Sequence, residues 1–271
     1  MMKTWALSCA LLSLLPATNG FTTPYQVKHS LLDGRRSTST EPQTPRGRAS
    51  TCHEMCGLVA LIAPTDGSVK HLQDITEQTE RILHRGPDGM EVKSEVHAGG
   101  SFALGHTRLA IVDPSHAGDQ PFELTFSNEK TYHLAANGEI YNHKDIYAKM
   151  VEEGWTEARK SQSDCEVIAH AYAKYGVDAV KYLDGMFAFC IVEQDKEGNI
   201  VSVLAARDRV GIKPLYHGIS QDGSHVFASE LKSLVGLVEP STVVAIPAGH
   251  YWTPESGLQR FHNPDWLCKV S

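Results

Sequence analysis

Apolar residues follow two different spacings along the chain after residue 55, and the two predict different elements. Runs that are alternating or continuously apolar predict β-strands over 57–63, 101–105, 108–112, 131–136, 185–192, 200–206, 213–217, 225–228 and 242–246. Apolar residues three and four positions apart predict helices over 71–83, 143–152 and 164–175, with a short helix from Glu230 to Leu234. Because strands predominate and cluster, we expect an α+β fold with antiparallel sheets inside and helices outside.

Glycine and proline interrupt these periodic segments at three places where polar residues gather. The segments 85–89, 113–121 and 208–214 are therefore predicted to be loops. Catalytic residues are disproportionately found on loops held by rigid strands, so these loops are candidate parts of a site. The glycine and prolines of residues 254–271 indicate a boundary segment, whose end, 263–271, we predict to be a linker or a truncated end.

The first 55 residues differ in composition from the rest of the chain. Residues 1–20 combine an early lysine, a short apolar run and small residues at 18–20, a pattern typical of a secretory signal peptide. This run is too short to span a bilayer. Residues 21–55 are rich in Ser, Thr and basic residues without apolar periodicity, which indicates a transit-like or disordered pro-segment. A signal followed by such a stretch resembles the two-part plastid address of algae with secondary plastids.

Two alternatives to a plastid location stay open. One is secretion with a disordered pro-segment, and the other is a cytoplasmic form translated from an internal start at Met55. Of the six cysteines, Cys9 and Cys52 lie in the first segment, and the others show no disulfide or metal-ligand spacing. This pattern favours a reducing final compartment over an oxidising one.

Charge limits the partners that the chain after residue 55 can have. Residues 1–55 carry a net charge of +3, so the remaining chain carries −10 of the total of −7. An acidic body argues against nucleic acid or an anionic membrane surface as its main partner. We also expect no membrane association after processing, because the sequence contains no further transmembrane candidate. An apolar fraction of 41% is ordinary for a soluble domain with its own core.

Cys56 stands in an unusual place, directly before the apolar run Gly57 to Ala63. A thiol acts as a nucleophile only as the thiolate, which requires a nearby base that titrates near the working pH. An N-terminal α-amine, with an unperturbed pKa of about 7.7–8.0, meets this need. If the chain before Cys56 were removed, this one residue would carry both groups. The alternative interpretation is a buried structural cysteine on a core strand.

A series of short motifs decides between these interpretations. They are Met55-Cys56-Gly57, His84–Asp88, Gly105–Asp113, Gln120-Pro121, Asn137–Asn142, Ser163–Glu166, Leu183–Phe189 and Ala206–Tyr216. In this order they resemble the class II glutamine amidotransferase domain, and most closely the glutaminase domain of glutamine-hydrolysing asparagine synthetase. The resemblance covers nearly all of residues 56–262, which we predict to be one domain. It implies an N-terminal-nucleophile hydrolase fold, a four-layer αββα sandwich of antiparallel sheets.

The resemblance also implies hydrolysis of L-glutamine to glutamate and ammonia through a thioester on Cys56. Thiolate attack on an amide produces an oxyanion, which needs preorganised hydrogen-bond donors. The resemblance assigns this role to the Asn137 side chain and the Gly138 backbone N–H. The enzyme would be active only if Cys56 becomes N-terminal.

The other end of glutamine carries a carboxylate and an ammonium group. Arg108 suits the carboxylate through its planar fork, and Asp164 and Glu139 suit the ammonium. The resemblance further implies that Ile111 and Val112 line the substrate pocket.

Each role has an alternative on local grounds. Arg108 could be a surface charge on a strand, Asp164 a helix cap, and Asn137-Gly138 a hairpin turn. The block 206–216 matches no phosphate-binding loop, and we interpret it as mainly structural. The loop 85–89 would contact the rim of the site or a partner domain.

The resemblance implies no cofactor for glutamine hydrolysis, and the histidines occur singly, without zinc-ligand spacing. ATP and Mg would belong only to a synthetase domain, whose phosphate loop is absent from this sequence. The implied partner is therefore an ammonia-accepting synthetase domain or subunit, for asparagine biosynthesis. The competing function is a catalytically inactive, glutamine-sensing regulatory module.

Overall fold

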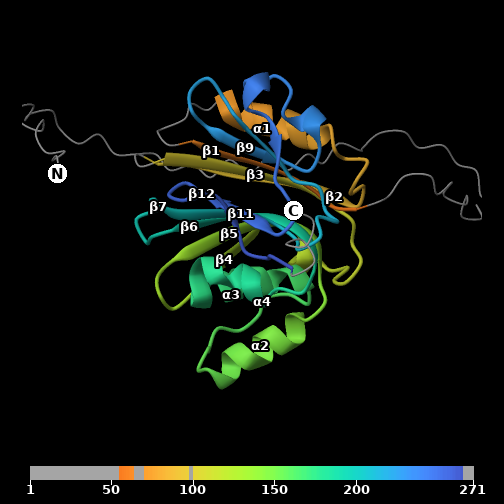
Figure 1. Cartoon of the computed structure of the whole chain (residues 1–271). Coiled ribbons are helices and arrows are strands. Elements are labelled where there is room, and N and C mark those ends of the chain that lie inside the picture. Colours follow the sequence, from red (N-terminus) through yellow and green to blue (C-terminus); the bar gives the residue numbers. More distant parts are fainter. Residues whose placement is uncertain (1–54, 64–69, 98–99, 265–271) are drawn as a thin grey trace, which may run out of the picture. The chain divides into compact units, whose positions relative to one another are not determined.

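Two six-stranded antiparallel sheets pack face to face in the computed structural model, which describes residues 55–63, 70–97 and 100–264 (Figure 1). The first sheet has the strand order β10, β8, β9, β1, β3, β2. These strands are β10 (Val244–Ala245), β8 (Tyr216–Ile219), β9 (His225–Ala228), β1 (Gly57–Ala63), β3 (Gly100–Arg108) and β2 (Gly89–His97). The predicted signal peptide, the transit-like segment up to residue 54 and the end of the chain from 265 lie outside the described residues.

The second sheet has the strand order β12, β11, β7, β6, β5, β4. These strands are β12 (Gly257–Arg260), β11 (His250–Thr253), β7 (Ile200–Arg207), β6 (Gly185–Gln194), β5 (Thr131–Ile140) and β4 (Phe122–Thr125). At its centre β5 and β6 pair without interruption from Thr131 opposite Gln194 to Ile140 opposite Gly185.

Strand β1 shows why the sheets stack in layers. All of its residues are buried, and successive side chains point to opposite faces of the sheet. Leu58, Ala60 and Ile62 pack between the sheets with β6 residues such as Val192. Val59, Leu61 and Ala63 instead join a cluster that contains Ile75 of the first helix. A strand covered on both faces is continuously apolar, which explains why its sequence does not alternate.

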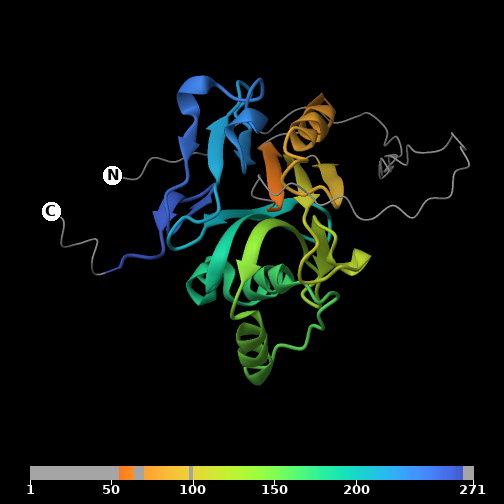
Figure 2. The ribbon, with the colours of Figure 1, turned by 90° about the vertical axis from the view of Figure 1, so that its right-hand side faces the viewer.

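Helices cover the two outer faces (Figures 1 and 2). Helix α1 (Lys70–Glu80) lies on the first sheet, and α3 (Val167–Tyr175) and α4 (Ala179–Tyr182) lie on the second, with α2 (His143–Glu152) beyond them. Short 3-10 helices are η1 (His116–Gly118), η2 (Asp164–Glu166), η3 (Gly176–Asp178), η4 (Leu231–Ser233) and η5 (Pro240–Thr242). The predicted four-layer αββα architecture is therefore confirmed.

Several predicted boundaries are wrong. The expected strand 101–105 is part of β3, which ends at Arg108, and the rest of the expected strand 108–112 is a loop. Strand β5 continues through Asn137 to Ile140. Strands β2, β4, β11 and β12 were not predicted, and β12 lies inside the segment expected to be a boundary. The strand expected over 213–217 begins only at Tyr216.

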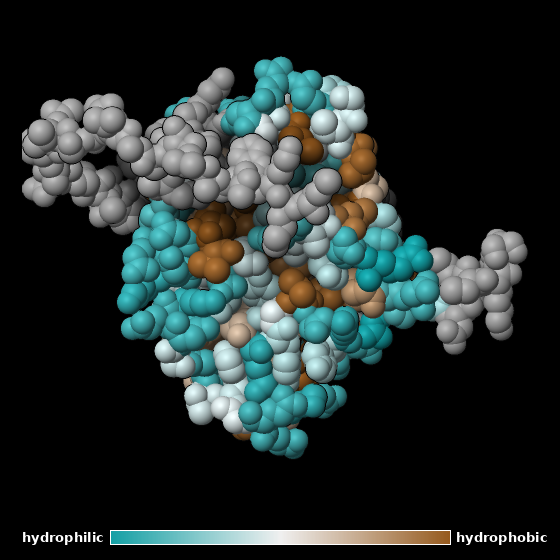
Figure 3. All heavy atoms as spheres, turned by 60° about the vertical axis from the view of Figure 1, so that its left-hand side comes forward, coloured by the Kyte–Doolittle hydropathy of each residue, from teal (hydrophilic) through white to brown (hydrophobic). Residues whose placement is uncertain are grey.

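The surface is predominantly hydrophilic on the face shown in Figure 3, where hydrophobic side chains of described residues form small separate groups. Among the described helices, none combines the length and the apolar character needed to cross a membrane.

Candidate active site

The antiparallel pairing of β1 with β3 brings Cys56 close to the end of β3. Gly57 pairs with Thr107, so the residue before β1 lies beside the chain that leaves β3 at Arg108. The Leu109 N–H donates to Cys56 Sγ at 3.3 Å. On the other side, Arg85 Nε donates to the Cys56 carbonyl at 3.1 Å. The cysteine is therefore held from two loops at one end of the sheet.

Burial and neighbouring charges act against each other on the Cys56 thiol. Burial raises its pKa above the ordinary value, and the Leu109 N–H and the positive charges of Lys213 and Arg108 offset part of this effect. The other described cysteines, Cys165 and Cys190, are more deeply buried, and burial raises the pKa of both. Because the raised pKa leaves little thiolate at neutral pH, Cys56 needs a base to act as a nucleophile.

Asn137 lies inside β5 and is wholly buried. Neither its Nδ2 nor its Oδ1 has a hydrogen-bond partner among the described residues. A buried amide left unpaired costs about 1–3 kcal/mol, and such groups in native proteins require an explanation. A donor reserved for a substrate atom is such an explanation, because Asn137 Nδ2 would then be paired only when substrate is bound.

Gly138, the next residue, occupies a backbone position that favours glycine. Its φ is +151°, and a Cβ at this position would lie 2.0 Å from the Met186 carbonyl oxygen of the neighbouring strand. The pairing of Gly138 with Phe187 in the strand register excludes the alternative of a hairpin turn at Asn137-Gly138.

Gly138→Ala should therefore lower the free energy of unfolding by about 2 kcal/mol or more, because both the backbone conformation and the space oppose a methyl group. Urea unfolding checks this value. Gly154→Ala is the matched control, since Gly154 has φ +88° with nothing within 4 Å of an added Cβ. The control should lose only about 1 kcal/mol, and equal losses in the two variants would contradict the steric explanation.

Asp164, the first residue of η2, is hydrogen-bonded to β5 two residues after Gly138. Its Oδ2 accepts the Ile140 N–H at 2.6 Å, and the neighbouring Cys165 Sγ contacts the Gly138 carbonyl at 3.5 Å. Ser163 and not Asp164 occupies the N-cap position of η2, and no side-chain capping bond is present there. The helix-cap alternative for Asp164 is therefore wrong.

The loop before η2 is held by a buried carboxylate. Glu166 is wholly buried and accepts the N–H groups of Lys160 and Ser161, each at 2.6 Å. His170 of α3 lies 3.2 Å from the same carboxylate. These hydrogen bonds lower the pKa of Glu166 in spite of its burial, so the group stays ionised and fixes the loop that carries Asp164.

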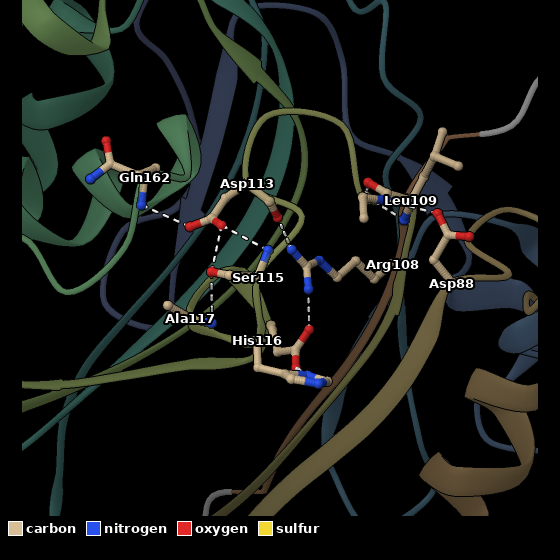
Figure 4. Close-up of polar contacts among 11 residues, drawn as sticks. Asp88, Arg108, Leu109, Asp113, Ser115, His116, Ala117 and Gln162 are labelled. Atoms are coloured by element: carbon tan, nitrogen blue, oxygen red, sulfur yellow. Dashed lines mark hydrogen bonds and ion pairs between the residues drawn. The ribbon is translucent and has the colours of Figure 1, made fainter.

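Arg108 belongs to a polar network on the loop after β3 (Figure 4). Its Nη1 pairs with Asp119, and its Nη2 donates to the Asp113 carbonyl. Asp113 in turn accepts the Gln162 N–H at 2.8 Å, which links this loop to the segment before Asp164. The Arg108 side chain is only 11% exposed, so the alternative of a surface charge is wrong.

His106 connects the two sheets next to this site. Its Nε2 donates to the Ala136 carbonyl on β5 at 3.0 Å. Burial lowers the pKa of His106 to about 4, so the ring is neutral at physiological pH. Among residues 55–63, 70–97 and 100–264, no group of three or more His, Cys, Asp or Glu could hold a metal ion.

Comparison with known families decides what kind of site this is. The family model for the glutamine amidotransferase domain matches residues 55–251. The chain belongs to this family. The match begins one residue before Cys56.

Relatives extend the comparison. The chain is 42% identical over 218 residues to "Asparagine synthetase [glutamine-hydrolyzing] 3" of Arabidopsis thaliana, a match that covers 80% of this chain and 34% of the relative. The corresponding protein of Zea mays is 41% identical, again over 80% of this chain and 34% of its own length. The chain thus spans about one third of the length of the curated relatives it matches.

Solved structures confirm the fold. The "allosteric regulatory enzyme of purine biosynthesis" matches with a TM-score of 0.59 at 22% identity, over 77% of this chain and 50% of that chain. Glutamine phosphoribosylpyrophosphate amidotransferase from B. subtilis gives the same values. At this identity the likeness shows the fold alone.

Within this glutamine amidotransferase domain, the structure gathers most of the predicted residues. Cys56 directly precedes β1, and Arg108 ends β3, the strand that pairs with it. Asn137 and Gly138 lie on β5, and Asp164 is hydrogen-bonded to Ile140 of the same strand. Glu139 follows on the same strand, and its charge acts on both Cys165 and Lys213. The hydrogen bond from His106 Nε2 on β3 to the Ala136 carbonyl on β5 joins the two groups of residues.

Ile111 and Val112 are more exposed than the other predicted site residues. Both lie on the loop after β3, where Ile111 is 64% and Val112 is 46% exposed. Their role as pocket-lining residues stays a prediction. Neither of two surface cavities, of about 530 and 490 Å³, is lined by these residues or by Cys56.

The sequence alone did not identify four other residues at the site. The Leu109 amide contacts the thiol, Arg85 holds the Cys56 carbonyl, and Asp119 pairs with Arg108. The fourth is Lys213, whose Nζ lies 2.9 Å from Met55 Sδ. Arg85 and Lys213 each lie in a motif visible in the sequence, His84–Asp88 and Ala206–Tyr216, but no local pattern indicates that either residue lies near Cys56.

Proposed function

We propose that this chain is the glutaminase part of an asparagine synthetase-type amidotransferase and that it hydrolyses L-glutamine to glutamate and ammonia. The position of Cys56 carries the proposal: it lies directly before the start of β1, its thiol contacts the Leu109 N–H, and cleavage before it would leave every described strand intact. Membership of the family and the glutamine-hydrolysing relatives support it.

The reaction begins with removal of the chain up to Met55, which gives Cys56 a free α-amine. This amine accepts the thiol proton, and the thiolate attacks the side-chain amide carbon of glutamine. The negative charge that develops on the amide oxygen is stabilised by Asn137 Nδ2 and the Gly138 N–H. The unpaired, buried amide of Asn137 supports this assignment, since a preorganised donor needs no reorganisation during the reaction.

The α-ammonium then gives its proton to the leaving nitrogen, and ammonia departs. Water attacks the resulting thioester, and glutamate is released with the thiol restored. No step requires a metal ion or an organic cofactor.

Recognition of the amino-acid end of glutamine requires one cation and one anion. Arg108 would bind the α-carboxylate, and Asp164 and Glu139 the α-ammonium group. Asp119 supports the first assignment because it holds the guanidinium in place by a salt bridge. The bond between Asp164 and the Ile140 N–H supports the second, since it leaves the other carboxylate oxygen for a ligand.

The ammonia would pass to a synthetase domain or subunit, for which the greater length of the relatives provides room. ATP and Mg would act there and not in this domain. We further propose that residues 1–55 deliver the protein to a plastid and are then removed. Translation from Met55, followed by removal of that methionine, would give a cytoplasmic form with the same N-terminal cysteine.

The test uses the full chain with a specific protease site placed directly before Cys56. Uncut protein should release no ammonia from glutamine, and the same sample should release ammonia and glutamate in equal amounts after cleavage. A matched variant with the site placed before Met55 should stay inactive after cleavage. Glutamine binding without turnover in every form would contradict the proposal and favour a regulatory module.

A further inference from the structure

Lys213 is a buried cation without a carboxylate partner. The residue is 4% exposed, and among the described residues no carboxylate lies within 4 Å of its Nζ. Its Nζ donates to Met55 Sδ at 2.9 Å, and a thioether is only a weak acceptor. Buried ammonium groups are normally paired, so this arrangement requires an explanation other than stability.

The backbone of Lys213 is fixed by the turn that follows β7. Its N–H donates to Asp208 Oδ2 at 2.9 Å, and its carbonyl accepts Arg207 Nε at 2.7 Å. Asp208 is wholly buried and also accepts the Val210 and Ile212 N–H groups. The turn therefore fixes the backbone position of Lys213.

Of the four charged and titratable groups that act on Lys213, three belong to the candidate site and the fourth, Asp208, holds the turn. They are Glu139, Arg85, Cys56 and Asp208. Burial lowers the pKa of the ammonium, while Glu139 and Cys56 act in the opposite direction. In return, Lys213 lowers the pKa of the Cys56 thiol by more than Arg108 does.

We propose that Lys213 is a positioning residue that holds its positive charge beside the N-terminal Cys56 and so favours the neutral α-amine and the thiolate. The inference rests on the proposed function, because it requires Cys56 to be N-terminal. Removal of Met55 takes away the sulfur that contacts Nζ and leaves the ammonium facing the new N-terminus. A like charge disfavours the α-ammonium, and an opposite charge stabilises the thiolate.

Two arginines add positive charge near Cys56: Arg108, which lowers the pKa of the thiol, and Arg85, whose Nε donates to the Cys56 carbonyl. Glu139 and Asp164 carry negative charge at the candidate site and act on the neighbouring Cys165. These four groups are common to the wild type and to a variant at position 213. A difference between the two proteins in the protonation of Cys56 therefore reports the contribution of Lys213.

The experiment compares the cleaved full-length wild type with Lys213→Met, which removes the charge at similar size. Both kcat/KM for glutamine and the rate of Cys56 alkylation by iodoacetamide are measured against pH. In the variant, the acid limb of both profiles should shift to higher pH by about one unit, as expected for loss of one nearby positive charge. Lys213→Arg should keep the wild-type profile, and Lys196→Met, at an exposed site, is the matched control.

Unchanged profiles in a folded Lys213→Met protein would overturn the inference. If that variant does not fold, Lys213→Gln provides the same comparison. Alkylation needs no turnover, so a cleaved protein without glutaminase activity would refute the proposed function and still report the effect of Lys213.

Discussion

Cleaved protein carrying Cys56→Ala should hydrolyse glutamine at least about 10⁴-fold more slowly than the cleaved wild type, because removal of a nucleophile leaves only the binding and oxyanion contributions. The other described thiols cannot replace it. Cys165 and Cys190 are buried in the core, and burial raises the pKa of Cys190 to about 12. Release of ammonia, measured in a coupled assay, gives the rate.

The same variant should still bind glutamine, since a methyl group keeps the α-amine and removes only the sulfur. Isothermal titration with glutamine checks this, and an affinity within about threefold of the wild type is expected. Cys190→Ala, which shortens a cysteine between the two sheets, is the matched control and should keep its activity. Turnover that survives in cleaved Cys56→Ala would show that the nucleophile is a different group.

The parts of the fold that could be predicted are those whose burial is reflected in composition. Strand β1 is continuously apolar because both of its faces are covered, and α2 has the predicted bounds, 143–152. Strand β2 was missed because it is an edge strand with partly exposed residues, of which only Met90, Val92 and Val96 are large and apolar. Strands β11 and β12 are four residues each, too short for a period of two to stand out.

The Asn137-Gly138 pair shows how tertiary structure overrides a local preference. This dipeptide is the strongest short-range signal for a hairpin turn, yet here it continues β5, because β6 pairs along its whole length. The positive φ of Gly138 is accommodated within the strand and not in a turn. Glycine is required at position 138 because of its positive φ and the nearby Met186 carbonyl oxygen, and not because of a turn.

The site was predicted where side-chain chemistry is distinctive and missed where the structure uses the backbone or long-range contacts. Arg108, Asn137 and Asp164 were predicted from the resemblance to the amidotransferase domain, and glutamine requires groups of their types. Leu109 contributes only its N–H, which leaves no signature in a sequence. Lys213 reaches Met55 across 158 positions of the chain, so its role becomes visible only in three dimensions.

These omissions share a physical cause. The site lies where the start of β1, the end of β3 and the second half of β5 meet, and these come from two different sheets. Residue types can indicate which chemistry is available, but the stacking of the sheets decides which charges act on Cys56. The stacking depends on core contacts that no single motif encodes.

Asn137→Ala should lower kcat by about 10²–10³-fold with little change in KM, because it removes an oxyanion donor that acts mainly in the transition state. The free energy of unfolding should change by less than about 1 kcal/mol. Asn137 makes no hydrogen bond to the described residues, so the substitution breaks none and removes a buried polar group. Steady-state kinetics of the cleaved protein and urea unfolding measure the two quantities.

Asn142→Ala is the matched control and should show the opposite behaviour. The Asn142 amide donates to the Tyr182 carbonyl at 2.9 Å and accepts the Asp184 N–H at 3.0 Å, away from Cys56. Its loss should cost about 1 kcal/mol of stability and leave kcat unchanged. If Asn137→Ala instead destabilised the protein like the control and kept its kcat, the buried amide would be a structural group, and the oxyanion would need another donor beside Gly138.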